Sequence, residues 1–283
     1  MKKKIGFIDY YIDEWHSNNY PRMISEGAYK DKFEVALAWE EITPEGKRPL
    51  DAWCREMGIG KAESIEQVVE ECDCIVVLSP NNSERHEDLA DLPLKSGKPV
   101  YIDKPFAPSL KVAKRLFAKA DKYGTPLMSS SALRFGSHLD NALKEIGTEQ
   151  VKFASARGGG MSFKVYCIHQ LEMIAMTMGM GAKRIMQCGN GSWELMTIDY
   201  GDGRRAAANW EYNSQFALSI SYGQDKVLNI NDMPDFFQRF VDAMLAFFET
   251  KKSVVPREQT LEVTALVEAG IAALAKHDVW VPV

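Results

Sequence analysis

Short apolar runs alternate with helix-like spacings through the first half of the chain. Between the runs, apolar residues recur three and four positions apart, as with Ile65 and Val68 or Val112 and Leu116. A strand followed by a helix, repeated, predicts a parallel sheet with right-handed crossovers. The predicted strands are Lys4–Ile8, Phe33–Trp39, Cys74–Leu78, Pro99–Ile102 and a short Pro126–Met128.

Polar residues and glycines predict where these helices begin and end. Ser64, with Gln67 three residues later, has the arrangement of a helix N-cap, and Ser109 has the same place before Val112. Gly97 and Gly124 stand where helices should stop and the chain should turn back into a strand.

The pattern changes after Gln150 to longer runs in which apolar and polar residues alternate. The turn Gly201–Gly203 predicts a hairpin between two of these runs. Such alternation is typical of an antiparallel sheet with one covered face. A helix with Phe236 and Phe240 and a last helix over Gln259–Lys276 follow. The predicted strands are Val151–Ala156, Glu194–Tyr200, Arg205–Trp210 and Phe216–Tyr222.

The chain is therefore predicted to be an α/β protein of two domains. Residues 1–128 would form a Rossmann-like, dinucleotide-binding domain with a parallel sheet. Residues 129–283 would form an α+β domain for substrate binding and oligomerisation, with a large, mostly antiparallel open sheet. The length of 283 residues, with 46% hydrophobic and 26% charged residues, suits a globular protein of this size.

Charge and composition exclude several classes of function. The 34 basic and 39 acidic residues give a net charge of -5, which argues against nucleic acid as a partner. No apolar stretch approaches the roughly 20 residues of a membrane helix, and the run after Lys2–Lys4 is too short for a signal peptide. We therefore expect a cytoplasmic protein with no membrane partner. The five scattered cysteines suggest structural thiols and no metal site.

The turn after the first strand is the usual place of a dinucleotide pyrophosphate. Of the Gly-x-Gly-x-x-Gly fingerprint only Gly6 is present, and Asp9, Asp13 and Glu14 would repel phosphate. Three interpretations stay open. The cofactor sits differently, the site has been rebuilt for another ligand, or the loop simply packs its aromatic side chains.

Two further residues could carry chemistry. Lys104 follows a buried strand within Asp103-Lys104-Pro105, where the peptide bond before Pro105 could be cis and the lysine could serve acid–base work or substrate positioning. The competing interpretation is a solvated lysine in a loop. His169 opens the apolar helix Leu171–Met178 and could exchange a proton with a hydroxyl, or it could be a packed, hydrogen-bonded histidine. Gly158–Gly160 before it suggest a mobile loop.

The order of these signals resembles the glucose-fructose oxidoreductase, inositol dehydrogenase and MocA family (Gfo/Idh/MocA). Gly97–Ala107 is similar to the family segment Gly-Lys-x-Val-x-x-Glu-Lys-Pro-x-Ala, with Asp103 in place of glutamate. Ser79-Pro80-Asn81 with His86 resembles its Thr-Pro-Asn-x-x-His segment at a longer spacing, and Leu133-Arg134-Phe135 resembles its Arg-Phe or Arg-Tyr.

The resemblance implies NAD or NADP as cofactor, a carbohydrate or polyol substrate, and a homodimer or homotetramer built on the open sheet. Lys104 and His169 would be the catalytic residues, with His169 taking a hydroxyl proton as hydride leaves and Lys104 stabilising the oxyanion. Glu40 ends the second strand, at the position where an acidic residue holds a ribose diol. Because no arginine adjoins it, Glu40 favours NAD over NADP. The other implied cofactor-binding residues are Gly6, Ile8, Asp9, Ser79, Pro80, Asn81, Asp103 and Lys104, and the implied substrate-binding residues are Lys104, Arg134, Lys164, Tyr166 and His169.

Two departures mark the chain as a divergent member. Val165 stands where the family has an aspartate four residues before the histidine, and Cys167 replaces its glycine. The leading hypothesis is an NAD(P)-dependent oxidoreductase that transfers hydride to or from a sugar, cyclitol or related polyol. The alternatives are a non-catalytic binding protein that has lost dinucleotide chemistry, and an enzyme that uses transient oxidation for elimination or glycoside cleavage.

Overall fold

The computed structural model describes all 283 residues and divides the chain into two compact units. The first unit contains Met1–Ser129 and Val241–Pro256, and the second contains Ser130–Phe240 and Arg257–Val283. The sequence predicts a domain boundary after residue 128, and the chain first passes from the first unit to the second one residue later, after Ser129. The prediction did not include the return of Val241–Pro256 to the first unit.

The first unit is built on a six-stranded parallel sheet of order β3-β2-β1-β4-β5-β6. This confirms the predicted Rossmann-like sheet, and it brings the carboxyl ends of β1, β4 and β5 to one edge. Its strands are β1 (Lys3–Asp9), β2 (Phe33–Glu40), β3 (Gly60–Lys61), β4 (Cys74–Val77), β5 (Val100–Ile102) and β6 (Leu127–Met128).

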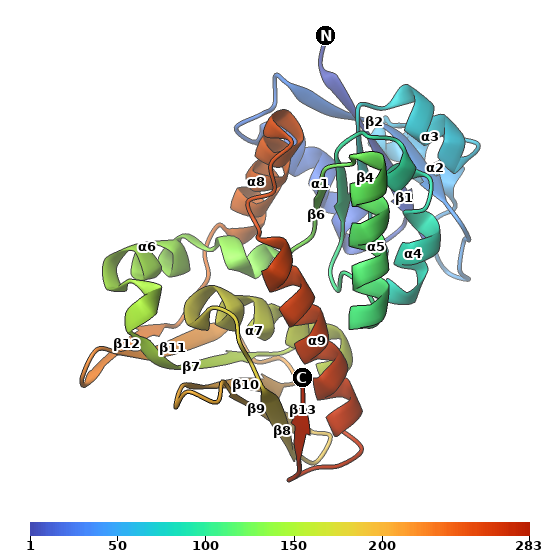
Figure 1. Ribbon diagram of the computed structural model, residues 1–283. Coiled ribbons are helices and arrows are strands. Elements are labelled where there is room, and N and C mark those ends of the chain that lie inside the picture. Colours follow the sequence, from blue (N-terminus) through green and yellow to red (C-terminus); the bar gives the residue numbers. More distant parts are fainter. The chain divides into compact units, whose positions relative to one another are not determined.

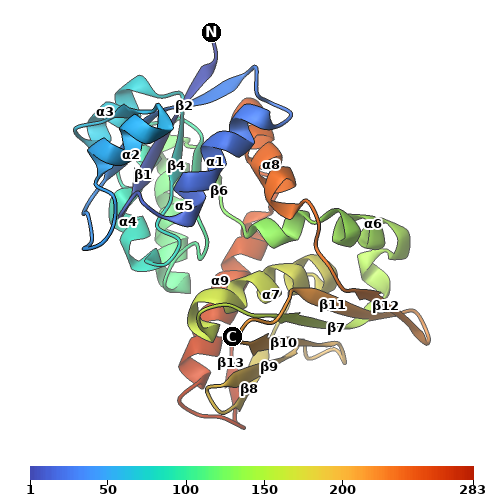
Figure 2. The same cartoon turned by 180° about the vertical axis from the view of Figure 1, so that it is seen from behind.

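Helices cover both faces of this sheet, with α5 in front of it in Figure 1 and α1 in front of it in Figure 2. Ser64 accepts a hydrogen bond from the Gln67 amide and Ser109 accepts one from the Val112 amide, which confirms both predicted caps. The helices are α1 (Trp15–Glu26), α2 (Leu50–Met57), α3 (Ile65–Glu71), α4 (His86–Leu89), α5 (Leu110–Tyr123) and, from Val241 on, α8 (Phe236–Thr250).

The second unit is built on a seven-stranded sheet of order β12-β11-β7-β10-β9-β8-β13. Only β7 and β10 pair in parallel, so the prediction of a mostly antiparallel sheet is confirmed. The predicted hairpin at Gly201–Gly203 joins β9 to β10. The strands are β7 (Val151–Gly158), β8 (Arg184–Gly189), β9 (Trp193–Asp199), β10 (Arg205–Glu211), β11 (Ala217–Tyr222), β12 (Lys226–Ile230) and β13 (Trp280–Pro282).

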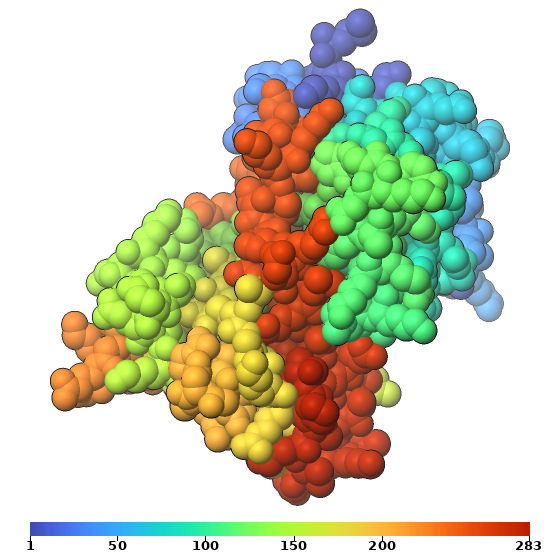
Figure 3. Space-filling view, in the orientation of Figure 1, coloured from blue at the N-terminus to red at the C-terminus, as the bar shows by residue number.

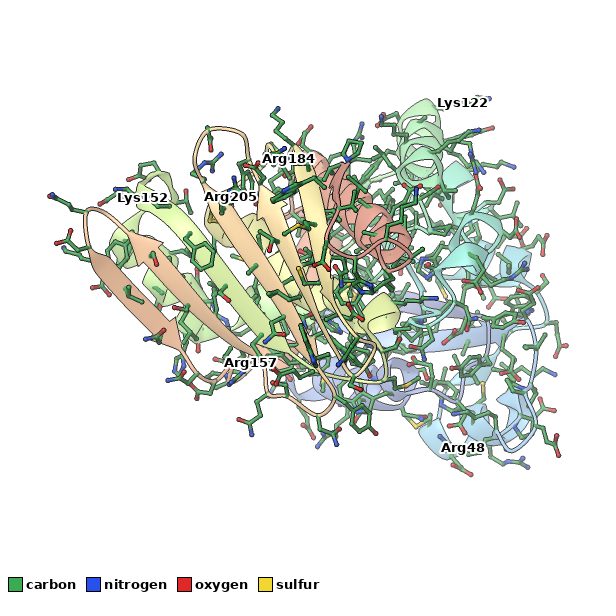
Figure 4. The ribbon with its side chains drawn as sticks, turned by 90° about the horizontal axis from the view of Figure 1, so that it is seen from below. Arg48, Lys122, Lys152, Arg157, Arg184 and Arg205 are labelled. Atoms are coloured by element: carbon green, nitrogen blue, oxygen red, sulfur yellow. The ribbon has the colours of Figure 1, made fainter.

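Helices α7 (Phe163–Met178) and α9 (Arg257–Ala273) pack together on one face of this sheet (Figure 1). Leu171 and Ile174 of α7 meet the inward residues Ala206 and Ala208 of β10 in the buried core. The other face carries no helix. Figure 4 shows this face, with Arg157, Arg184 and Arg205 labelled. Helix α6 (Ser137–Ile146) lies beside the β11–β12 hairpin at the edge of the unit (Figure 3).

Two local expectations were wrong. His169 does not open a helix, because α7 already begins at Phe163. Gly158–Gly160 are held by close packing, and they do not form the loose loop that the sequence suggested. A side chain on Gly158 would meet the Phe216 ring at 2.2 Å, and one on Gly160 would meet the Tyr166 ring at 2.1 Å.

Candidate functional site

The turn between β1 and α1 places an acidic side chain on the helix N-terminus. Both carboxylate oxygens of Glu14 are used there, one accepting from the His16 amide at 2.8 Å and the other from the Ser17 amide at 2.7 Å. The Ser17 hydroxyl returns toward the Glu14 amide and completes a capping box. The exposed amides of this helix end are the groups that ordinarily bind a pyrophosphate in such a fold. In this chain they already bind a carboxylate.

Gly6 and Ile8, predicted to contact the cofactor, are packing residues of β1. A Cβ on Gly6 would lie 2.3 Å from a Val68 methyl group and 3.0 Å from the Cys72 sulfur, so the missing side chain allows α3 to approach the sheet. Ile8 is completely buried in the core.

Asp9 ends β1 inside a cluster of buried acidic groups. Its side chain is fully buried beside the backbone amides of Tyr10 and Tyr11. Burial, and then the nearby charge of Glu14, raise the pKa of Asp9 well above the usual aspartate value. His16 joins the cluster, with Nδ1 2.9 Å from a Glu14 oxygen and 3.7 Å from an Asp103 oxygen. The edge of the sheet at β1 and β5 is therefore dominated by carboxyl groups.

Glu40 lies at the end of β2, as predicted, and its carboxylate is occupied by the chain itself. It accepts hydrogen bonds from the Ile12 amide at 2.9 Å, the Leu50 amide at 3.0 Å and the Thr43 hydroxyl at 2.5 Å. These bonds tie the β1–α1 turn to the start of α2. A cavity of about 220 Å³ lies beside Glu40, lined also by Trp39, Lys61 and Glu63.

The segment after β4 is held against the segment after β5 by a buried histidine. Nε2 of His86 lies 2.7 Å from the Leu78 carbonyl oxygen, and Nδ1 lies 3.0 Å from that of Phe106. Ser79 has the positive φ of 74° that a tight turn requires, and its hydroxyl donates to the Asn82 carbonyl.

Of the cofactor residues predicted in this segment, Pro80 is buried and Asn81 is exposed. The Asn81 amide group lies 3.5 Å from the Tyr11 hydroxyl oxygen. Ser79, Pro80 and Asn81 thus follow β4 at the same sheet edge as Asp9 and Asp103, which end or follow β1 and β5.

Lys104 projects from this sheet edge and is 7% exposed, so the solvated-loop interpretation was wrong. The Lys104–Pro105 peptide bond is cis, as the sequence allowed. Nζ of Lys104 donates to the Pro80 carbonyl at 3.4 Å, and burial lowers the pKa of the ammonium group. The charges of Asp103 and Glu14 oppose that fall. A lysine with a lowered pKa is suited to proton transfer or to stabilising developing negative charge.

In the second unit, His169 is the seventh residue of α7, at the end of its second turn. Its ring lies between Tyr166 and Phe216, with ring centroids 5.5 and 5.4 Å away. Nδ1 of His169 is 2.7 Å from the hydroxyl oxygen of the buried Ser131. Tyr166 is therefore a neighbour of His169, as a shared substrate site requires, whereas Lys164 is exposed.

Arg134, predicted to bind substrate, is 5% exposed and engaged inside the second unit. Nε of Arg134 donates to a Glu172 oxygen at 2.7 Å, and Nη1 donates to the Gln259 side chain at 2.6 Å. The other Glu172 oxygen accepts the Ser131 amide at 3.2 Å. Arg134 and Glu172 thus hold the segment that carries Ser131, and Ser131 contacts His169.

Lys104 lies in the first unit and His169 in the second. Their pairing at one catalytic centre remains the prediction made from the sequence. No group of three or more His, Cys, Asp or Glu side chains is arranged to hold a metal ion. None of the helices combines the length and apolar character needed to cross a membrane.

Comparison with known proteins gives a family match that lies mainly in the first unit. The model of an oxidoreductase family with an NAD-binding Rossmann fold, Gfo/Idh/MocA, matches residues 25–131. This segment therefore resembles the Gfo/Idh/MocA family. The curated "Uncharacterized oxidoreductase YhhX" of Escherichia coli K12 is 30% identical over 118 residues, which are 41% of this chain. The match spans about a third of that relative, 33% of its length.

Solved structures share the fold of this chain over its whole length. A probable dehydrogenase from Thermotoga maritima has a TM-score of 0.82 at 13% identity, covering 99% of this chain and 98% of its own. The WlbA dehydrogenase of Bordetella pertussis, in complex with NADH and UDP-GlcNAcA, has a TM-score of 0.79 at 14% identity and covers 100% and 99%. At these identities the likeness concerns the fold alone.

The residues at the β1–α1 turn do not fit a dinucleotide in its usual Gfo/Idh/MocA position. Glu14 occupies the amides that would hold the pyrophosphate, and Glu40 is bound to backbone amides where it would hold a ribose. A dinucleotide in that place would require Glu14 to leave the helix end.

Proposed function

We propose that this chain is an oxidoreductase that acts on a hydroxyl or carbonyl group of a small sugar, cyclitol or related polyol. Lys104 and His169 are the groups proposed to handle the proton and the charge on the reacting oxygen. The observation that carries the proposal is the buried Lys104 ammonium group, with its lowered pKa, at the carboxyl edge of a parallel sheet. The family match over residues 25–131 supports a redox reaction.

NAD or NADP is the proposed redox cofactor, because the matching family model describes an NAD-binding fold. Glu40 at the end of β2 favours NAD, since a carboxylate there repels the 2′-phosphate of NADP. The occupied α1 N-terminus opposes the usual position of the pyrophosphate, so we expect binding to depend on displacing Glu14.

A second candidate is a binding protein that keeps the fold and has lost dinucleotide chemistry. The Glu14 carboxylate on the α1 amides favours it, because that contact satisfies the helix end without any ligand. Val165 in place of an aspartate on α7 points the same way.

Titration with NAD, NADH, NADP and NADPH, by calorimetry and nicotinamide fluorescence, tests the proposal and separates the two candidates. The protein is first checked for cofactor carried through purification. Micromolar binding of one pair, followed by turnover in a sugar and polyol screen, is the expected result for the oxidoreductase. Failure of all four to bind at millimolar concentration would leave the binding-protein candidate. Products formed without net NADH would indicate the elimination or glycoside-cleaving alternative.

We also propose that the bare face of the seven-stranded sheet joins two copies into a homodimer or part of a homotetramer. Outward-facing Ser219, Ser155, Ala207 and Thr197 lie in one row across four strands and make the centre of this face flat. Phe153 is 37% exposed on the same face. A flat face with exposed apolar side chains suits packing against a second sheet.

Light scattering coupled to sizing is expected to give the mass of a dimer or a larger assembly at micromolar concentration. Ala207→Asp should dissociate it, since a charge would be buried at the centre of the contact. Val254→Asp, at an apolar residue that is 53% exposed in the first unit, is the matched control and should leave the mass unchanged. A monomeric wild-type protein would rule the assembly out.

A further inference from the structure

A cavity of about 280 Å³ lies at the amino end of the parallel sheet, and all of its lining residues belong to the first unit. It is found where β1, β4 and β5 begin, whereas Lys104 follows the opposite, carboxyl end of β5. Cys74, Pro99 and Phe248 are its buried lining residues. The cavity is therefore separate from the groups proposed to act in catalysis.

Positive charge dominates the lining of this cavity. Lys3, Lys98 and Lys251 contribute three ammonium groups, against the single carboxylate of Asp73. One oxygen of that carboxylate already accepts the Lys4 amide at 2.8 Å. An excess of positive charge is thus gathered at one cavity of a chain whose net charge is -5.

The lysines come from distant parts of the chain and act on the same buried group. Burial, and then the charge of Asp73, raise the pKa of the Cys74 thiol to about 12, and the charges of Lys3 and Lys251 oppose this rise. Nζ of Lys3 donates to Glu249 at 3.0 Å, which uses one of its three protons. Lys3 and Lys251 therefore have donors left for a ligand in this cavity.

Lys251 occupies a strained position directly after α8. Its amide donates to the Phe247 carbonyl at 2.7 Å, and its φ of 59° is the left-handed conformation in which a helix usually ends on glycine. A side chain at this position costs conformational energy that glycine would not. The Lys251 ammonium group is exposed and forms no ion pair within the chain. A strained residue that carries an unneutralised charge is typical of a functional position.

We propose that this cavity binds a compact polyvalent oxyanion of the phosphate class. Lys251 and Lys3 donate to its oxygens, and Lys98 adds a positive charge whose position is fixed by the carbonyl oxygens at the end of α3. The volume is near the lower end of small-molecule sites, which measure about 300 to 1,000 Å³, so it suits a phosphate group or a small phosphate ester. The site is independent of the proposed redox function.

Calorimetric titration of the whole protein with inorganic phosphate, and separately with glycerol 3-phosphate, tests the site. Sodium chloride keeps the ionic strength constant, because salt screens exposed charges. We expect saturable binding at one site per chain. The probe with the higher affinity shows whether free phosphate or a phosphate ester is the ligand. If neither probe binds saturably at millimolar concentration, the proposal is wrong.

Variants of Lys251 locate the binding. Lys251→Gln should weaken the affinity for the bound probe at least about tenfold. Lys252→Gln is the matched control, because it removes the same charge from the next residue, which is exposed and does not line the cavity. Lys251→Gly should raise the melting temperature, since glycine suits the positive φ, and should still weaken binding. Wild-type affinity in either Lys251 variant would overturn the proposal and leave Lys251 as the end of a helix only.

Discussion

The Glu14→Gly variant is expected to bind NADH at least about tenfold more tightly than the wild-type protein, a gain of about 1.4 kcal/mol. In the wild-type protein the Glu14 carboxylate accepts two hydrogen bonds from the α1 N-terminus. A bound pyrophosphate would need the same amides and would meet the same negative charge. Glycine removes the charge and is itself an accepted residue at a helix N-cap, so the helix should persist.

Glu26→Gly is the matched control for this variant. Glu26 is the exposed last residue of the same helix, so the substitution removes the same charge at the end remote from Glu14. We expect calorimetry and nicotinamide fluorescence to give wild-type affinity for it. Equal NADH affinity in wild-type and Glu14→Gly proteins would contradict the role assigned to Glu14, whatever the absolute affinity.

The sheet of the first unit could be predicted because its strands are short, apolar and separated by helical spacings. The Ser64 and Ser109 caps were also visible, since a cap is a local pattern of neighbouring residues. Strand β8 was not predicted. Its inward position Gln187 is polar and breaks the apolar alternation, and its side-chain amide nitrogen donates to the buried Glu194 of the next strand at 3.1 Å.

The candidate site could be predicted only in part. The sequence indicated Lys104, His169 and the acidic character of the first turn. It also contains the three-residue spacing of the Glu14–Ser17 capping box, a local signal that was missed. The complete burial of Asp9 and the contact between Ser131 and His169 depend on side chains brought together by the tertiary fold. For the same reason the hydrogen bonds of Arg134 to Glu172 and Gln259 could not be predicted, and its contact with substrate stays a prediction.

Lys104→Met is expected to stabilise the protein at neutral pH while reducing turnover at least about a hundredfold. Burial lowers the pKa of Lys104 below its ordinary value of 10.5. Between the lowered folded pKa and 10.5 the unfolded chain binds a proton that the folded protein does not, so wild-type stability rises with pH across that window. Methionine has no such group. Its advantage should therefore be largest below the folded pKa and should vanish as the pH approaches 10.5.

Lys98→Met provides the contrasting variant, and denaturant unfolding at several pH values is the measurement. Nζ of Lys98 donates to the carbonyl oxygens of Val69, Glu70 and Cys72 at the end of α3, so its removal leaves acceptors unpaired. We expect it to destabilise the protein by about 1 to 3 kcal/mol. The two substitutions would then change the free energy of unfolding in opposite directions. Lys98 is stabilised by its hydrogen bonds to carbonyl oxygens, whereas the Lys104 ammonium group is destabilised by burial. A destabilised Lys104→Met protein would instead mark Lys104 as structural, and would remove the observation on which the proposed function depends most.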